Sequence, residues 1–98
     1  MSTPGSLESL TRAVEAMHNC KAQHASAGLV HEMMDGKTVW KGNVEIFTLS
    51  GHPKADKAFA WAYRDENGEV EYLAVLSVPP INSPREAVQA AIASGAQK

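Results

Sequence analysis

Hydrophobic and polar residues alternate along this chain with changing periods, and the periods predict its elements. Near the N-terminus, apolar side chains recur every three or four residues, at Leu10, Ala13, Val14, Met17 and Cys20. This spacing places them along one side of an amphipathic helix. We predict that the helix begins at Leu7, is capped by Ser6, continues to about residue 25 and ends near Gly28.

The later part of the chain changes to a period of two residues, which is typical of β-strands. Strands are predicted at 44–49, 58–63 and 70–78. A polar loop at 50–57 separates the first two strands, and Pro79-Pro80 ends the third because neither proline can donate to a sheet. These strands are expected to form an antiparallel meander.

The turn between the second and third strands sets their predicted register. We take Asp65-Glu66-Asn67-Gly68 as the tight connection, so that Arg64 pairs with Glu69 and opposite charges lie side by side. The same register places Trp61 beside Tyr72.

A second helix has the clearest local signals in the chain. Ser83 is placed to cap it, Pro84 suits the first helical position, and Glu86 completes a capping box. Its predicted buried face consists of Ala87, Val88, Ala91 and Ile92. Gly95 follows as a stop signal.

Residues 29–40 allow two interpretations. Asp35-Gly36 is a strong signal for a two-residue hairpin turn, which would pair 31–34 with 37–40. The glutamate and methionines of this segment favour a helix instead. The sequence leaves both structures open.

Together these elements predict one α+β domain over residues 1–98, with a flexible lead-in at 1–6 and a flexible tail at 95–98. A three-stranded antiparallel meander is flanked by N- and C-terminal helices, in the order α-β-β-β-α, with an extra hairpin at 29–40 as the open alternative. Two helices are expected to cover one face of the sheet.

Both faces of the central strands are strongly apolar. We assign the helices to the alanine side, at Ala58, Ala60 and Ala62, so that the aromatic side faces outward. The inverse assignment, with the aromatic residues in the core, stays open. In either case the second face needs a cover, because an antiparallel sheet with a wet face alternates with polar residues. A homodimer, a folded-back segment 29–40 or another protein would supply it.

Composition narrows the class of protein. Hydrophobic residues make up 44% and charged residues 20% of the chain, as in globular domains. The formal net charge of −2 gives no general attraction to nucleic acid or anionic membranes. Cys20 is the single cysteine, and we find neither a signal peptide nor an apolar stretch of membrane-spanning length. A cytoplasmic location is expected.

Cys20 and His24 are the first candidates for chemistry. On a helix they would be four residues apart and on one side, a spacing that suits two ligands of one metal or a thiol and a base. A structural role is favoured, because no paired Cys-x-x-Cys motif accompanies them. We therefore predict no catalytic residue, no metal and no cofactor, and keep a small metal- or thiol-dependent enzyme as an alternative.

The loop 50–57 is the second candidate, because His52, Lys54 and Lys57 could contact an anion or nucleic acid. In topology alone, the order α-β-β-β-α resembles the double-stranded RNA-binding domain. That family carries a lysine-rich phosphate clamp at the start of its last helix. Here Pro84-Arg85-Glu86 offers one positive and one negative charge. RNA binding through the loop is therefore an alternative function.

The leading hypothesis is a non-enzymatic protein-interaction module that self-associates through an apolar sheet face. The alternation of aromatic and small residues from Phe59 onward motivates it. Trp61, Tyr63 and Tyr72 are the predicted contact residues.

Overall fold

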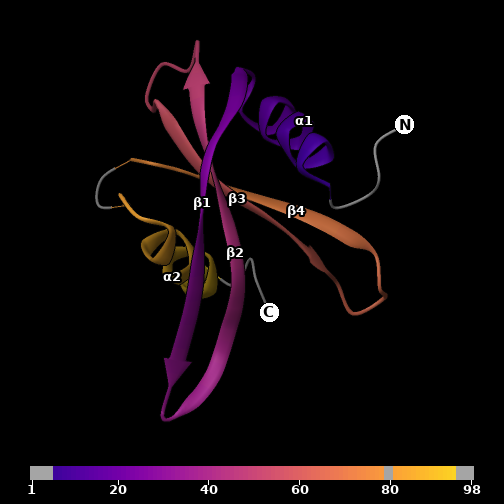
Figure 1. Cartoon of the computed structure of the whole chain (residues 1–98), viewed down its shortest axis with the longest axis vertical. Helices are drawn as coiled ribbons and strands as arrows, with labels where there is room; N and C mark the ends of the chain where they lie inside the picture. Colours follow the sequence, from indigo (N-terminus) through magenta and orange to yellow (C-terminus); the bar gives the residue numbers. More distant parts are fainter. Residues whose placement is uncertain (1–5, 79–80, 95–98) are drawn as a thin grey trace.

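The elements of the fold follow the predicted order, with one more strand. A computed structural model of the chain describes residues 6–78 and 81–94. Within them the elements are α1 (Leu7–His18), β1 (Lys21–Met34), β2 (Lys37–Ser50), β3 (Lys57–Arg64), β4 (Val70–Leu76) and α2 (Pro84–Ser94). The four described strands form one antiparallel sheet in the order β1-β2-β3-β4 (Figure 1). The predicted α+β fold is confirmed.

Some predictions concern residues outside this description. They are the lead-in before Ser6, the end of the sheet at Pro79-Pro80, the helix stop at Gly95 and the tail 95–98.

Helix α1 begins as predicted but is shorter. The Ser6 hydroxyl accepts a hydrogen bond from the Ser9 N–H at 3.1 Å and so caps the helix. The predicted end near residue 25 is wrong, because Asn19 adopts the left-handed conformation, with φ 49° and ψ 53°, and stops the helix at His18. The chain that follows pairs with β2 as a strand.

The hairpin interpretation of residues 29–40 is confirmed. Asp35 and Gly36 both have positive φ, 53° and 77°, as a tight turn between twisted strands requires. The pairing of β1 with β2 extends from Met34 opposite Lys37 to Lys21 opposite Ser50. It is interrupted by irregularities near the start and near the tip of the hairpin.

The predicted register between β3 and β4 is wrong by one residue. The Asp65 N–H donates to the Glu69 carbonyl at 2.9 Å, so these residues close the turn. Gly68 has a positive φ of 80°, which glycine adopts without strain. Trp61 consequently lies opposite Leu73 and not Tyr72. A shift of one residue transfers every β4 side chain to the other face of the sheet.

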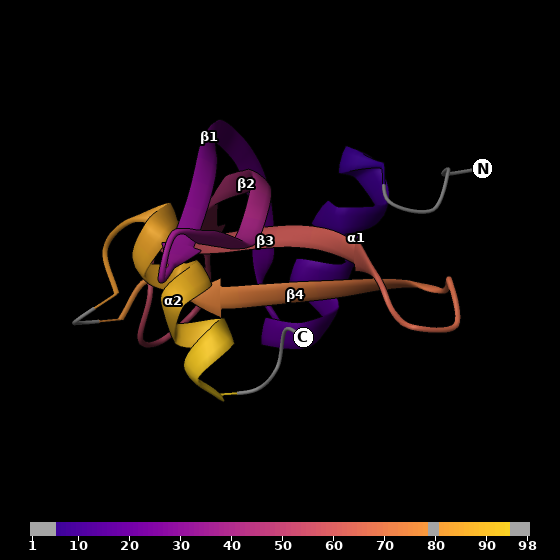
Figure 2. The ribbon, with the colours of Figure 1, turned by 90° about the horizontal axis from the view of Figure 1, so that it is seen from below.

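Each helix covers a different face of the sheet, so the expectation that both cover one face is wrong. Helix α1 packs its Leu10 and Val14 onto the alanine side of β3. Helix α2 packs Ala87, Val88 and Ala91 onto the aromatic side, which holds Phe59 and Trp61. The two helices lie apart in both views (Figures 1 and 2). Large residues thus meet small ones at each interface, which lets both interfaces close.

The sheet separates into two hairpins, β1–β2 and β3–β4, where the pairing between β2 and β3 ends. Pairing between β2 and β3 extends only from Thr48 opposite Lys57 to Glu45 opposite Ala60, and beyond it the hairpins diverge (Figure 1). We call this divergence the fork.

The indole rings of Trp40 and Trp61 bridge the fork on the α2 side. Their centroids are 5.4 Å apart in an edge-to-face arrangement. Gly42 makes room for Trp40, because a Cβ there would lie 3.1 Å from the indole ring.

Truncation of Trp61 should therefore destabilise the fold. Trp61 is 2% exposed, and we expect Trp61→Ala to lower the free energy of unfolding by about 3–5 kcal/mol through lost burial and an unfilled cavity. Urea unfolding followed by far-ultraviolet circular dichroism measures this. Leu29→Ala, at a site 70% exposed, is the control and should change stability by less than about 0.5 kcal/mol. Equal effects of the two substitutions would contradict the packing described.

Candidate interaction surface

Beyond the fork, the β1–β2 hairpin continues as a two-stranded arm, residues 29–43, which extends past α2 in Figure 1. One face of this arm is its inner face, where Val30, Glu32 and Trp40 turn toward α2. We call the opposite side the outer face. By strand alternation and register, it consists of Leu29, His31, Met33, Thr38, Lys41 and Asn43.

Exposed apolar side chains gather on this arm. Leu29 is 70% and Met33 53% exposed on the outer face, and Met34 and Val39 are 61% and 46% exposed at the tip. Seven large hydrophobic residues are exposed in the described part of the chain, and these four are the majority. Scattered apolar residues are normal on protein surfaces, whereas a gathered patch is typical of a binding surface.

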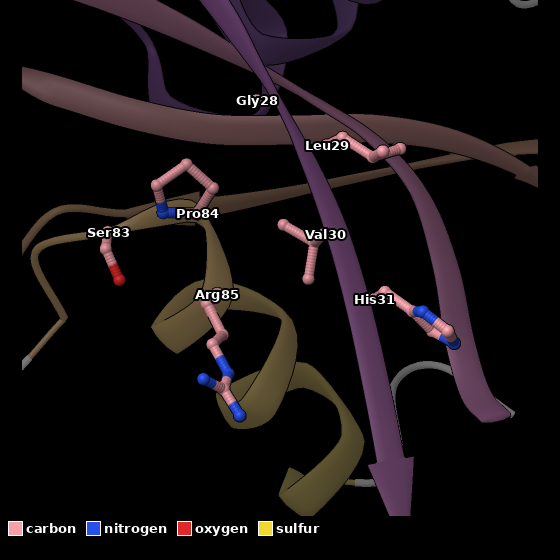
Figure 3. A pocket seen from close by; sticks show the side chains of 7 residues that line it. All are labelled: Gly28, Leu29, Val30, His31, Ser83, Pro84 and Arg85. Carbon is pink, nitrogen blue, oxygen red and sulfur yellow. The ribbon is translucent and has the colours of Figure 1, made fainter. Parts of the chain in front are cut away.

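The polar residues of the outer face are basic or neutral. Lys41 lies opposite His31 in the register, and the His31 Nε2 is 2.7 Å from the Thr38 hydroxyl. Figure 3 shows that Leu29 and His31 point away from α2, whereas Val30 points toward it. None of the six residues of the outer face carries a carboxylate.

An ion pair attaches the inner face of the arm to α2. The Arg85 Nε donates to the Glu32 carboxylate at 2.6 Å, and the Gln89 amide lies 3.4 Å from the same oxygen. Glu32 is 8% exposed, although Arg85 remains largely accessible. The hydrogen bond from Arg85 holds the pKa of Glu32 below its ordinary value, because it stabilises the ionised form.

Two hollows flank the arm. One, of about 220 Å³, lies at the fork and is lined by Leu7, Leu10, Asn43, Glu45, Trp61 and Ala62. The other, of about 300 Å³, lies between β1 and the start of α2 (Figure 3). In the second hollow, the Ser83 hydroxyl accepts a hydrogen bond from the Glu86 N–H, and Arg85 binds Glu32. Both polar side chains therefore already have partners within the chain.

The structure distributes the predicted partner-binding residues over different places. Trp61 is 2% exposed and packs beneath α2. Tyr63 and Tyr72 are half-buried, and they pack against the cores on the α2 and α1 faces respectively. The three side chains therefore form no common surface, and a role in partner binding stays a prediction.

The loop residues predicted to contact an anion have local roles in the structure. The His52 Nδ1 accepts hydrogen bonds from the Lys54 and Ala55 N–H groups at 3.0 and 3.1 Å, which shapes the loop. Its ring also meets the edge of His18, with centroids 6.1 Å apart. Lys54 and Lys57 are exposed. Anion or nucleic-acid contact through this loop stays a prediction.

Cys20 and His24 do not share a helix, because α1 ends before both. Cys20 is half-buried and packs against the core beneath α1. His24 lies on β1, with its ring 5.6 Å from Phe47 and its Nε2 3.4 Å from the Glu45 carboxylate. Across residues 6–78 and 81–94, no three His, Cys, Asp or Glu side chains gather as a metal site.

Neither described helix has the length and hydrophobicity needed to cross a bilayer. Compared with known proteins, the chain matches no family model, no curated protein and no solved structure.

Sequence reasoning missed the arm as a binding surface. The signal was present, because Leu29 and Met33 alternate with Val30 and Glu32 just before the Asp-Gly turn. It was hidden by the expectation that the first helix reaches residue 25, which left too little chain for a long strand.

The contact between Glu32 and Arg85 makes stability depend on pH. A carboxyl group whose pKa is lowered by folding stabilises the fold above its unfolded pKa of about 4.3, and this contribution is lost as the pH falls through the folded pKa. We expect Arg85→Met to reduce the free energy of unfolding at pH 7, with a difference from wild type that shrinks below about pH 4. Urea unfolding at a series of pH values measures the difference.

Arg12→Met is the matched control for this measurement. Arg12 pairs with Glu8 at 2.9 Å, but both side chains are more than half exposed, so its effect should be small at every pH. A pH-independent effect of Arg85→Met would show that the arm is not attached to α2 by this ion pair.

Proposed function

We propose that this chain is a non-enzymatic protein-interaction module whose contact surface is the outer face of the arm. The observation that supports this is the gathering of exposed apolar side chains on an element that extends past α2. A cytoplasmic location is part of the proposal, since the single cysteine needs no oxidising compartment.

The composition of the outer face suits recognition. Leu29 and Met33 supply apolar area, and methionine adapts to partners of different shape because its side chain is unbranched and polarisable. Lys41, Asn43 and Thr38 surround them with polar groups, as in the rim of a protein interface.

The proposal differs in location from the one based on the sequence. The sequence predicts self-association through the aromatic side of the sheet, but α2 covers Phe59 and Trp61 on that side within the same chain. Within the described residues, most of the large apolar side chains that remain exposed are on the arm. Self-association itself stays a prediction, which the mass of the protein in solution decides.

The size of the surface favours reversible binding. An apolar patch of this kind covers on the order of a few hundred Å², whereas a standard stable interface buries about 800 Å² on each partner. A partner must therefore also contact neighbouring surfaces, or bind weakly and exchange quickly.

Site-specific photo-crosslinking tests the proposal directly. A photoreactive side chain at position 33 should give discrete adducts in cells that express the protein, because Met33 lies within the surface. The same group at position 17, where Met17 is 50% exposed on α1, is the matched control and should give few. Denaturing electrophoresis and mass spectrometry identify the adducts.

A second substitution makes the result specific. Leu29→Ser should reduce the adducts from position 33 several-fold without loss of fold, since Leu29 is largely exposed. The proposal is wrong if position 33 gives no adduct, or if positions 17 and 33 give the same adducts.

A further inference from the structure

We infer that the hollow at the fork binds a small organic ammonium ion, a primary amine on an apolar body about as large as a benzene ring, with the Glu45 carboxylate as its counterion. The inference goes beyond the proposed function and does not depend on it, because it concerns a free small molecule and not a partner protein. The described residues that line the hollow are Leu7, Leu10, Asn43, Glu45, Trp61 and Ala62.

The Glu45 carboxylate has fewer partners than a buried charged group needs. Its Oε2 is buried and has no hydrogen-bond partner among the described residues. Its Oε1 lies 3.4 Å from the His24 Nε2, and no lysine or arginine of the described residues forms an ion pair with it. Buried polar atoms in folded proteins nearly always have a partner. An orphaned carboxylate oxygen at the wall of a hollow therefore indicates that a donor binds there.

Glu45 also determines the sign of the charge in the hollow. Of the six described residues that line it, Glu45 alone has an ionisable side chain. Lys41 is four residues away on the same strand, which is about 13 Å. That separation exceeds the Debye length of about 8 Å at physiological ionic strength, so salt screens Lys41 from a ligand beside the carboxylate.

The N-terminus of α1 does not reverse this sign, although it borders the hollow at Leu7. A helix N-terminus is equivalent to about half a positive elementary charge, which is less than the full negative charge of a carboxylate. Glu8 and Arg12 in the first turns of α1 pair at 2.9 Å and so neutralise each other. The hollow therefore favours a cation over a neutral or anionic ligand.

The size and walls of the hollow suit an amine that carries an apolar body. Its volume is about 220 Å³, and an apolar cavity of about 150 Å³ is known to hold benzene. Leu7, Leu10 and Ala62 provide apolar contacts for the ring. Asn43 is exposed beside them, and its amide oxygen can accept a second hydrogen bond from the ammonium group.

The fork fixes the backbone of Glu45 and leaves its side chain accessible. Glu45 pairs with Ala60 at the last paired position between β2 and β3, where the two strands begin to diverge. Its side chain is 24% exposed. The terminal torsion of a glutamate side chain is broad, so either carboxylate oxygen can turn toward a ligand at little cost.

Nuclear magnetic resonance titration of the full isotope-labelled chain tests the inference. The probes are phenethylamine, the neutral phenethyl alcohol and the anionic hydrocinnamate, which share a ring and a two-carbon linker. The amine should shift the amide signals of Asn43, Glu45 and Ala62 in a saturable manner, with a dissociation constant of about 1 mM. The alcohol should bind about fivefold more weakly, because it lacks the charge, and hydrocinnamate more weakly still.

Variants assign the binding to the hollow. Glu45→Gln keeps the shape and removes the charge, so it should weaken the amine about fivefold and leave the alcohol unchanged. Glu66→Gln, at an exposed carboxylate in the β3–β4 turn, is the matched control and should change neither. Ala62→Leu should weaken both ligands by filling the hollow. Circular dichroism confirms that each variant remains folded.

A lysine peptide separates the two sources of this chemistry. A glycine-lysine-glycine peptide with blocked ends carries the same ammonium group on a side chain without a ring. It should bind several-fold more weakly than phenethylamine, because it cannot fill the apolar part of the hollow. Binding as tight as that of the amine would overturn the assignment to a free small molecule and would give the hollow to a lysine of a protein.

Three other results would overturn the inference. They are equal binding of the amine and the alcohol, the absence of shifts at the amides around the hollow, and equal effects of Glu45→Gln and Glu66→Gln. None of them changes the expected adducts from position 33, so the proposed interaction module is tested separately. Loss of those adducts would likewise leave the amine site standing.

Discussion

The packing of α2 against Phe59 and Trp61 is the contact on which the rest of the structure depends. It covers the sheet face that would otherwise expose aromatic side chains, and it holds Trp40 and Trp61 together across the fork. Helix α1 covers the opposite face with Leu10 and Val14. Because each helix covers one face, a single chain buries both sides of its central strands. A small domain of this length needs that arrangement, since it has little other apolar surface to bury.

The same contact explains why one surface remains open. Helix α2 attaches only to the inner face of the arm, through Val30, Trp40 and the ion pair between Glu32 and Arg85. The first turn of helix α1, at Leu7 and Leu10, borders the hollow at the fork, and the helix does not extend along the arm (Figure 1). The arm is therefore held by α2 on its inner face and exposes apolar and basic groups on its outer face. Preorganised strands lose little entropy on binding, which favours recognition by such a surface.

Much of the fold could be predicted from local signals, because caps and turns depend on few residues. Ser83 caps α2, and Asp35-Gly36 makes the hairpin. The wrong predictions are the end of the first helix and the β3–β4 register. In both places, the conformation of one residue with positive φ determines how the residues after it continue. Asn19 ends α1 early, and Gly68 shifts β4 by one residue. The sheet faces and the arm depend on those two positions and on tertiary packing, so periodicity alone could not locate the candidate surface.

The central claim is that one chain covers both faces of its sheet and leaves the outer face of the arm exposed, where we propose that a partner binds. Light scattering coupled to size exclusion, over a wide range of protein concentration, tests it most directly. The account predicts a mass of 10.5 kDa at the lowest concentrations, because the chain itself covers both faces of its sheet. A stable dimer at the lowest concentrations would contradict it, because an apolar surface would then be covered by a second copy.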